Sequence, residues 1–130
     1  MLGELEADGD LVICDMEAGL GTVSRLTRGQ LDVVLVVAEP SAKGVDVARR
    51  AAQIGSARAR VIVVANRLRG REDLEAVRSA VGEHELVGVP EEPVIAQADR
   101  EGVSPIDLDP EAPGVRAVRD LAARIAESRG

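Results

Sequence analysis

The sequence contains no phenylalanine, tyrosine or tryptophan, although 45% of its 130 residues are hydrophobic. A core must therefore be built from valine, leucine, isoleucine and alanine. The same absence removes the aromatic rings on which nucleic-acid-binding proteins usually stack bases. Because the formal net charge is −7, we expect neither a nucleic acid nor an anionic membrane surface to be a direct partner.

Cysteine is also scarce, and no apolar run is long enough to span a membrane. The single cysteine, Cys14, permits no internal disulfide and suits a reducing compartment. No signal peptide is recognisable, so we expect a cytoplasmic protein. Cys14 is expected to be a small, buried strand residue. The lone histidine, His84, lies among acidic residues, and we expect it to be solvated rather than a metal ligand.

Four short apolar runs and three amphipathic stretches define the expected fold. The runs are residues 11–14, 33–38, 61–65 and 86–89, and such runs are typical of parallel strands covered on both faces. The predicted helical faces are formed by Val45, Ala48 and Ala52, by Leu74, Val77 and Val81, and by Val115, Val118, Ala122 and Ile125. We predict one α/β domain over residues 1–130, with an open, doubly wound, mostly parallel sheet of about four strands and flanking helices.

Polar residues and a proline-rich turn follow these runs, and ligands of open parallel sheets gather at the carboxyl ends of the strands. The residues concerned are Asp15, Glu39, Asn66, Arg67, Pro90 and Glu91. A carboxylate such as Asp15 can hold a Mg²⁺-bound water, and the amide of Asn66 offers a donor and an acceptor that match a purine edge. Asp15 capping the following turn, or Asn66 capping the next helix, explains the same residues equally simply.

These motifs resemble the C-terminal half of the MinD/ParA (SIMIBI) type of P-loop ATPase. The nearest likeness is to the accessory ATPases that help to insert nickel into carbon monoxide dehydrogenase. LVICDMEAG at 11–19 resembles the family's Walker B and switch II segment, a strand followed by Asp-x-x-Ala-Gly. VVAEPS at 36–41, VIVVANR at 61–67, VPEEP at 89–93 and the tail AQADREGVSPIDLDPEAPGVRAVRDLA at 96–122 resemble later family segments in the same order.

The resemblance implies ATP and Mg²⁺ as cofactors. It assigns the catalytic positions to Asp15, which orders a Mg²⁺-bound water, and to Gly19 in the switch turn. It places Asn66 and Arg67 at the adenine, with Pro90 and Glu91 in a turn whose backbone borders the base. The family's nickel-binding Cys-x-Cys pair is absent here, so we expect no protein metal site.

The family's phosphate-binding loop is missing. That loop ends in Gly-Lys-Thr or Gly-Lys-Ser, whereas the only lysine here is Lys43, in the unrelated stretch SAKGV. We therefore expect a truncated domain, either a fragment, a split gene product or a shortened descendant, that does not hydrolyse ATP by itself. Loss of the loop's strand predicts direct pairing of the first two strands or dimerisation. The expected partners are a second copy, or a separate chain that carries the P-loop half.

Two other functions fit the same residues. The first is a non-catalytic interaction or regulatory module on the same fold. The second is a degenerate phosphoacceptor receiver domain, because DLVICDMEAGLG at 10–21 also resembles the aspartate-bearing strand of that family. Receivers require an earlier acidic pair and a lysine on the last strand, and the sequence provides neither.

Overall fold

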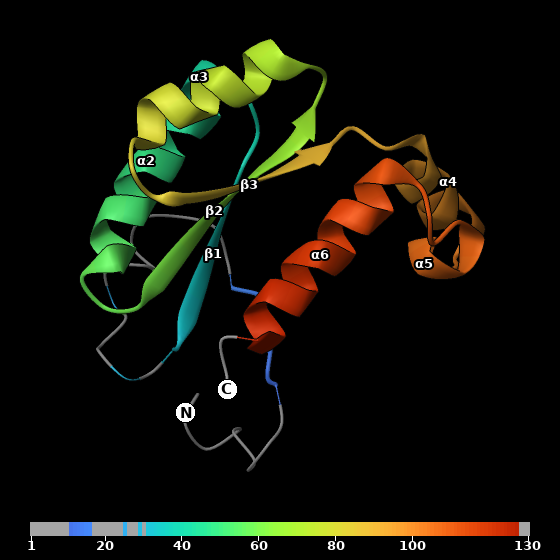
Figure 1. The fold of residues 1–130 in the computed structure, drawn as a ribbon, viewed down its shortest axis with the longest axis horizontal. Helices are drawn as coiled ribbons and strands as arrows, with labels where there is room; N and C mark the ends of the chain where they lie inside the picture. The colour runs from blue at the N-terminus through green and yellow to red at the C-terminus, as the bar shows by residue number, and fades with distance from the viewer. Residues whose placement is uncertain (1–10, 17–24, 26–28, 30, 128–130) are drawn as a thin grey trace.

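A three-stranded parallel sheet flanked by helices forms the body of the protein in the computed structural model, which describes residues 11–16, 25, 29 and 31–127. The strands β1 (Val33–Ala38), β2 (Arg60–Leu68) and β3 (Glu85–Pro90) lie in the order β1-β2-β3 (Figure 1). The helices are α2 (Ala42–Ser56), α3 (Arg71–Val81), α4 (Pro93–Glu101), α5 (Pro105–Leu108) and α6 (Pro113–Glu127). The predicted open α/β class is confirmed.

The central strand β2 is the most deeply buried element. Its segment 61–65 is buried on both faces, as its unbroken Val-Ile-Val-Val-Ala sequence predicts. Val63 pairs with Val36 of β1 and with Leu86 of β3, and all the pairings are parallel. The parallel register brings the carboxyl ends of all three strands to one edge of the sheet.

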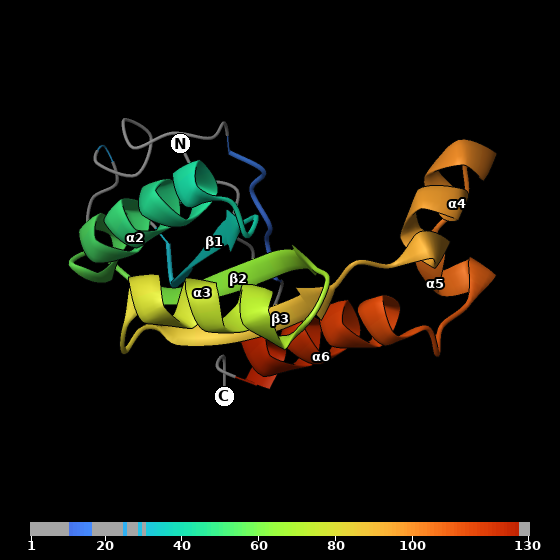
Figure 2. The same cartoon turned by 90° about the horizontal axis from the view of Figure 1, so that it is seen from above.

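Helices α2 and α3 cover one face of the sheet (Figure 2). Ala48, Ala52 and Val77 are at most 2% exposed and pack against Val36 and Val63. The predicted apolar faces of these two helices are therefore confirmed. Small alanines on α2 let the helix approach the sheet closely, which a core without aromatic side chains requires to exclude voids.

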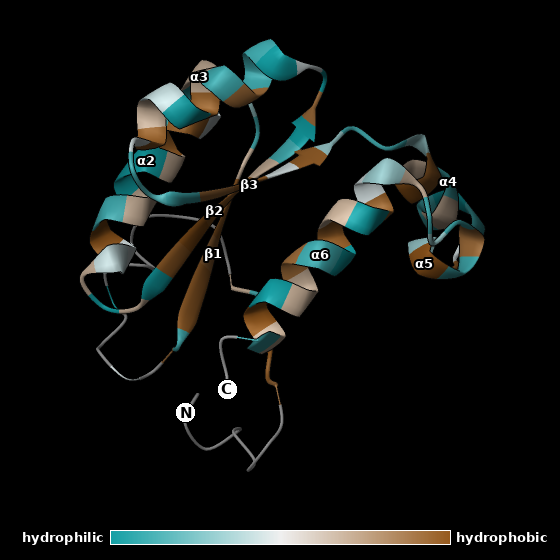
Figure 3. Cartoon of the chain, viewed as in Figure 1, coloured by the Kyte–Doolittle hydropathy of each residue, from teal (hydrophilic) through white to brown (hydrophobic). Residues whose placement is uncertain are grey.

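Helix α6 packs on the opposite face, against β2 and β3 (Figures 2 and 3). Its start at Pro113 agrees with the sequence signals, but its predicted apolar stripe is partly wrong. Val118 is 47% exposed and Ala122 is exposed, whereas Leu121 is 8% exposed and packs against Ile62 and Val64. The stripe at 117, 121 and 125 faces the sheet because i and i+4 positions share one side of a helix.

The predicted first strand is wrong for the sheet as described. Residues 11–16 are not in a strand, and the strand count is three rather than about four among the described residues. Ile13 is 78% exposed, and Cys14 is half-exposed rather than buried. An apolar run becomes a strand only when a neighbouring strand satisfies its backbone hydrogen bonds, and residues 11–16 pair with no strand of the sheet formed by the described residues.

Helices α4 and α5, which the sequence patterns do not predict, form a lobe that projects away from the sheet (Figures 1 and 2). The lobe leaves the body after β3 and returns at the start of α6. Pro93 and Pro105 stand at the first turn of their helices, where a missing N–H has no consequence. Among the helices of the described chain, none has the length and apolar character needed to cross a membrane.

Candidate functional site at the carboxyl edge of the sheet

Four charged side chains meet where β1, β2 and β3 end. Arg67 Nη1 lies 3.3 Å from Glu39 Oε1, and Arg67 Nη2 lies 3.9 Å from Glu91 Oε1. Arg69 Nε lies 3.3 Å from Glu91 Oε2. We call Glu39, Arg67, Arg69 and Glu91 the rim cluster. It joins the ends of all three strands, but its members are 45–78% exposed, so each pair contributes at most about 1 kcal/mol to stability.

The backbone of β2 is irregular at this edge. The pairing with β3 shifts between Ala65 and Leu68, and Arg67 adopts a left-handed φ of 58°. A non-glycine residue in this region costs roughly 1–2 kcal/mol. The ladder resumes where Glu91 N–H donates to the carbonyl oxygen of Leu68 at 2.8 Å. Backbone outliers of this kind are common at binding sites.

Asn66 lies at the start of this irregularity, directly after the fully buried Ala65. Its side chain is half-buried, and its amide makes no hydrogen bond to any of the residues the structure describes. Pro90, also half-buried, is the register partner of Leu68 on the neighbouring strand. An amide with an unused donor and acceptor thus lies at the same edge of the sheet as Pro90, and such an amide can pair with any partner that offers one donor and one acceptor.

The predicted site residues divide into two groups. Asn66, Arg67, Pro90 and Glu91 lie together at the carboxyl edge. Asp15 is exposed in the segment 11–16, outside the sheet, and makes no ion pair or hydrogen bond with the other described residues. Gly19 lies outside the described residues. The structure therefore brings together the four residues predicted to border a base and leaves Asp15, predicted to order a Mg²⁺-bound water, apart from the sheet.

Glu92 is a structural residue that the sequence patterns do not single out. It is half-buried, and its carboxylate accepts hydrogen bonds from Val94 N–H at 3.3 Å and from Gly114 N–H at 2.8 Å. These donors belong to the first turns of α4 and α6, where a negative charge is favoured by the helix dipole. Pro93, at the first position of α4, was the signal that identifies Glu92 as its N-cap.

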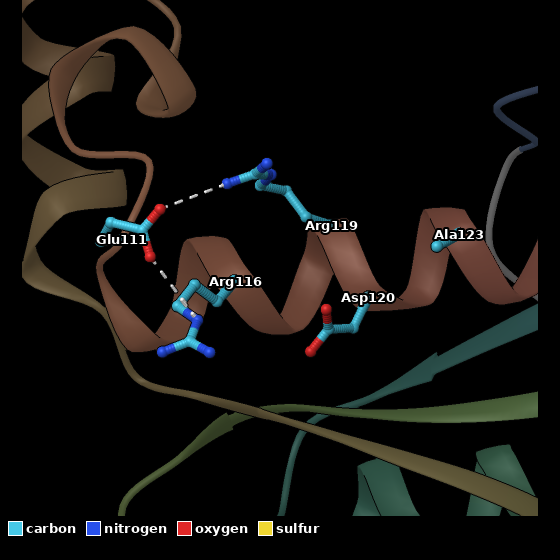
Figure 4. A pocket seen from close by; sticks show the side chains of 5 residues that line it. All are labelled: Glu111, Arg116, Arg119, Asp120 and Ala123. Carbon is cyan, nitrogen blue, oxygen red and sulfur yellow. Dashed lines mark ion pairs between the residues drawn. The ribbon is translucent and has the colours of Figure 1, made fainter.

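Other charged or polar features lie away from the edge. A depression of about 370 Å³ on α6 is lined by Glu111, Arg116, Arg119, Asp120 and Ala123 (Figure 4). Glu111 pairs with Arg116 at 3.9 Å and with Arg119 at 3.8 Å, so both arginines of the depression already have a carboxylate partner. Across the described ranges, no group of three or more His, Cys, Asp and Glu side chains is arranged to hold a metal ion.

Lys43 and His84 do not join the rim cluster. Lys43 is exposed at the second position of α2, and His84 is half-buried in the turn before β3. The His84 carbonyl accepts a hydrogen bond from Arg78 Nη1 at 2.9 Å.

Comparison with known proteins gave no matching family model and no matching curated protein.

Proposed function

We propose that this chain is the base-bordering part of a MinD/ParA-type nucleotide-binding domain and does not hydrolyse ATP by itself. The observation that supports the proposal is the amide of Asn66, half-buried at the carboxyl edge of a parallel sheet that also carries Pro90, with no hydrogen-bond partner among the described residues. In this proposal Asn66 recognises the adenine edge, and the backbone at Pro90 and Glu91 borders its face. The protein acts in the cytoplasm.

Phosphate binding by this chain is weak in the proposal. Arg67 and Arg69 are the cations of the rim cluster, and both already pair with carboxylates. A triphosphate would have to displace Glu39 and Glu91 and would meet a chain of net charge −7. The role of Asp15 in ordering a Mg²⁺-bound water, with Gly19 in its turn, belongs to the complete ATPase and requires phosphates held by another element.

Titration of the full chain with adenosine, followed by NMR, tests the base site. We expect shifts of the amides of Asn66 and Glu91 that guanosine does not reproduce. Asn66→Ala should abolish them, whereas Gln97→Ala, which alters an exposed side-chain amide on α4, should leave them unchanged. Adenosine shifts that are absent, or equal to those with guanosine, would contradict base recognition.

Calorimetry with ATP and Mg²⁺ tests whether the domain is incomplete. We expect little or no heat from the chain alone, because charge-assisted contacts to phosphate are the strong ones at such sites and the P-loop that makes them is absent. Tight, Mg²⁺-dependent ATP binding by the isolated chain would overturn this part of the proposal.

The proposed partner is a separate chain that carries the Gly-Lys-Thr loop, or a second copy of this chain. Mixing with such a P-loop chain should restore Mg²⁺-dependent ATP binding, and Asn66→Ala should weaken it. A role in carbon monoxide dehydrogenase maturation would have to operate without the Cys-x-Cys pair, which the sequence lacks.

A second candidate is a protein-interaction module on the same fold. The α4–α5 lobe favours it, because Val103 and Ile106 are each 45% exposed on a part of the chain that projects from the body (Figure 2). Ile106→Asp should then remove a specific partner in pull-down experiments while Asn66→Ala retains it. The opposite result favours the nucleotide-binding proposal.

A further inference from the structure

The outer edge of β1 is an apolar strand edge without a neighbour among the described residues. β1 pairs only with β2, so the backbone groups on its other side lack ladder partners in the described sheet. Leu35 is 37% and Val37 is 62% exposed, because the cluster under α6 takes in β2, β3 and, from β1, only the first residue, Val33. β1 contains no charge, proline or bulge, the devices that normally protect an edge strand.

The same chain carries an exposed apolar segment of matching character. Residues 11–14 read Leu-Val-Ile-Cys and lie outside the sheet, where Figure 1 draws them in blue. Leu11 is 45%, Val12 42% and Ile13 78% exposed. Exposing three consecutive large aliphatic side chains is unfavourable, since burying each contributes about 1.5–3 kcal/mol.

We propose that residues 11–14 dock as a fourth strand, parallel to β1, at its outer edge. The connection fits, because parallel neighbours need about a dozen residues or more between them, and residues 17–32 supply more than that. Docking closes the unpaired edge and places apolar side chains beside Leu35 and Val37. The inference concerns the sheet and does not depend on nucleotide binding.

A second copy is the weaker occupant for two reasons. A tethered segment acts at an effective concentration near the millimolar range, above the micromolar concentration of ordinary protein solutions. In addition, symmetric pairing of two β1 strands is antiparallel, which brings Asp32 of each copy close to Glu39 of the other. Like charges placed opposite one another destabilise such a pair.

Docking has a consequence for the carboxyl edge. If the strand ends are aligned, Ile13 lies beside Val37 and Asp15 lies beside Glu39, the first residue after β1. Asp15 then reaches the edge that holds Asn66 and the rim cluster. Pairing of residues 11–14 with β1 would therefore bring Asp15 close to the residues that we propose border the base.

Cysteine cross-linking in the full chain tests the proposal. Ile13→Cys and Val37→Cys are introduced together in a Cys14→Ala background, because neighbouring strands lie within the Cα separation that a disulfide spans. Mild oxidation should convert the two thiols into one intramolecular disulfide, with a reductant-sensitive shift on a gel and a monomer mass. Ile13→Cys with Val118→Cys on α6 is the matched control, and it should remain reduced.

Hydrogen exchange of the wild-type chain gives an independent measurement. Alternate amides within residues 12–14 should point toward β1 and exchange on the order of tenfold or more slowly than in an unstructured peptide. Exchange of all these amides at the unstructured rate would overturn the proposal, whatever the cross-link shows. A covalent dimer in place of the intramolecular disulfide would overturn it in favour of a second copy.

Discussion

Glu92 and Gly114 are linked by a hydrogen bond of 2.8 Å from the Gly114 N–H to Glu92 Oε1, although 21 residues separate them in the chain. The contact is so close that a Cβ at position 114 would collide with the Cβ of Glu92 and lie 2.8 Å from its Cγ. One carboxylate and one glycine therefore hold the first turns of α4 and α6 together.

Gly114→Ala is the first prediction. Replacing a helical glycine by alanine normally stabilises a protein by about 1 kcal/mol, but here the added methyl group collides with Glu92. We expect a loss of roughly 1–3 kcal/mol in the free energy of unfolding, as for overpacked sites. Urea denaturation measures it. Gly70→Ala, at an extended residue with open space around it, is the control and should change stability by less than about 0.5 kcal/mol.

The carboxylate of Glu92 gives the second prediction. Glu92→Ala removes the acceptor for both Val94 and Gly114 and should destabilise the fold by about 1–2 kcal/mol, as loss of a helix cap does. Glu92→Gln should recover part of the loss, since one oxygen remains. Glu91→Ala removes only exposed ion pairs and should cost less than about 1 kcal/mol. Equal losses for Glu91→Ala and Glu92→Ala would show that the two helix starts are not held by Glu92.

The third prediction concerns acid stability. The pKa of Glu85 is lowered below 4.5, chiefly by its hydrogen bonds to Arg60 at 2.8 and 3.0 Å and then by the one to Arg124 at 3.1 Å. A depressed carboxyl pKa adds stability above the ordinary glutamate range, and that stability is lost as the pH falls through the lowered pKa. The stability difference between wild type and Glu85→Gln should therefore shrink as the pH drops below about 4.5.

Two variants separate the contributions to this effect. Arg60→Gln should remove more of the acid-dependent difference than Arg124→Gln, because Arg60 makes two hydrogen bonds to Glu85 and Arg124 makes one. Chemical denaturation over a pH series measures both. A difference between wild type and Glu85→Gln that is constant with pH would contradict the assigned cause of the pKa shift.

The left-handed backbone of Arg67 gives the fourth prediction. Arg67→Gly relieves the unfavourable φ of 58° and should change stability by less than about 1 kcal/mol, since the lost ion pairs are exposed. Arg67→Val places a β-branched residue in the same conformation and should be less stable than Arg67→Gly by at least about 1–2 kcal/mol. Thermal unfolding of the two variants gives the comparison. If valine were tolerated as well as glycine, residue 67 would not be left-handed in solution.

The orientation of α6 gives the fifth prediction. Leu121→Ala removes a side chain that packs against Ile62 and Val64 and should cost about 2–5 kcal/mol. Val118→Ala removes apolar atoms from a side chain that is 47% exposed and should cost less than about 1 kcal/mol. Denaturant midpoints measure both. The reverse order would restore the stripe that the sequence suggested.

The sequence predicts the parts of the fold that carry a continuous apolar run or a regular helical spacing of apolar residues. β1 was predicted with its observed bounds, and the buried faces of α2 and α3 follow directly from helical spacing. Helical spacing does not show which face of α6 packs on the sheet. One possible apolar stripe has positions 115, 118, 122 and 125, and another has positions 117, 121 and 125. Only packing against Ile62 and Val64 distinguishes them.

The candidate site was predictable only in part, for a similar reason. The parallel register places Asn66 and Pro90 at one edge, as strand-end residues in such a sheet must be. A strand is positioned by hydrogen bonds to a neighbour that is distant in the sequence. The apolar run at 11–14 alone therefore does not show whether it pairs with β1. Glu92 was missed because its second partner, Gly114, lies on a helix remote in sequence.

The closed base of the α4–α5 lobe has a consequence for how the chain can vary. The chain leaves the sheet at Glu92 and comes back at Gly114, and these two residues are joined by a hydrogen bond. We call the segment between them, residues 93–113, a cassette, because both of its ends are held at one place. We expect that it can be shortened or exchanged as long as Glu92 and Gly114 keep their hydrogen bond. Diversity among proteins of this architecture should therefore accumulate in this cassette, with the strands beneath it unchanged.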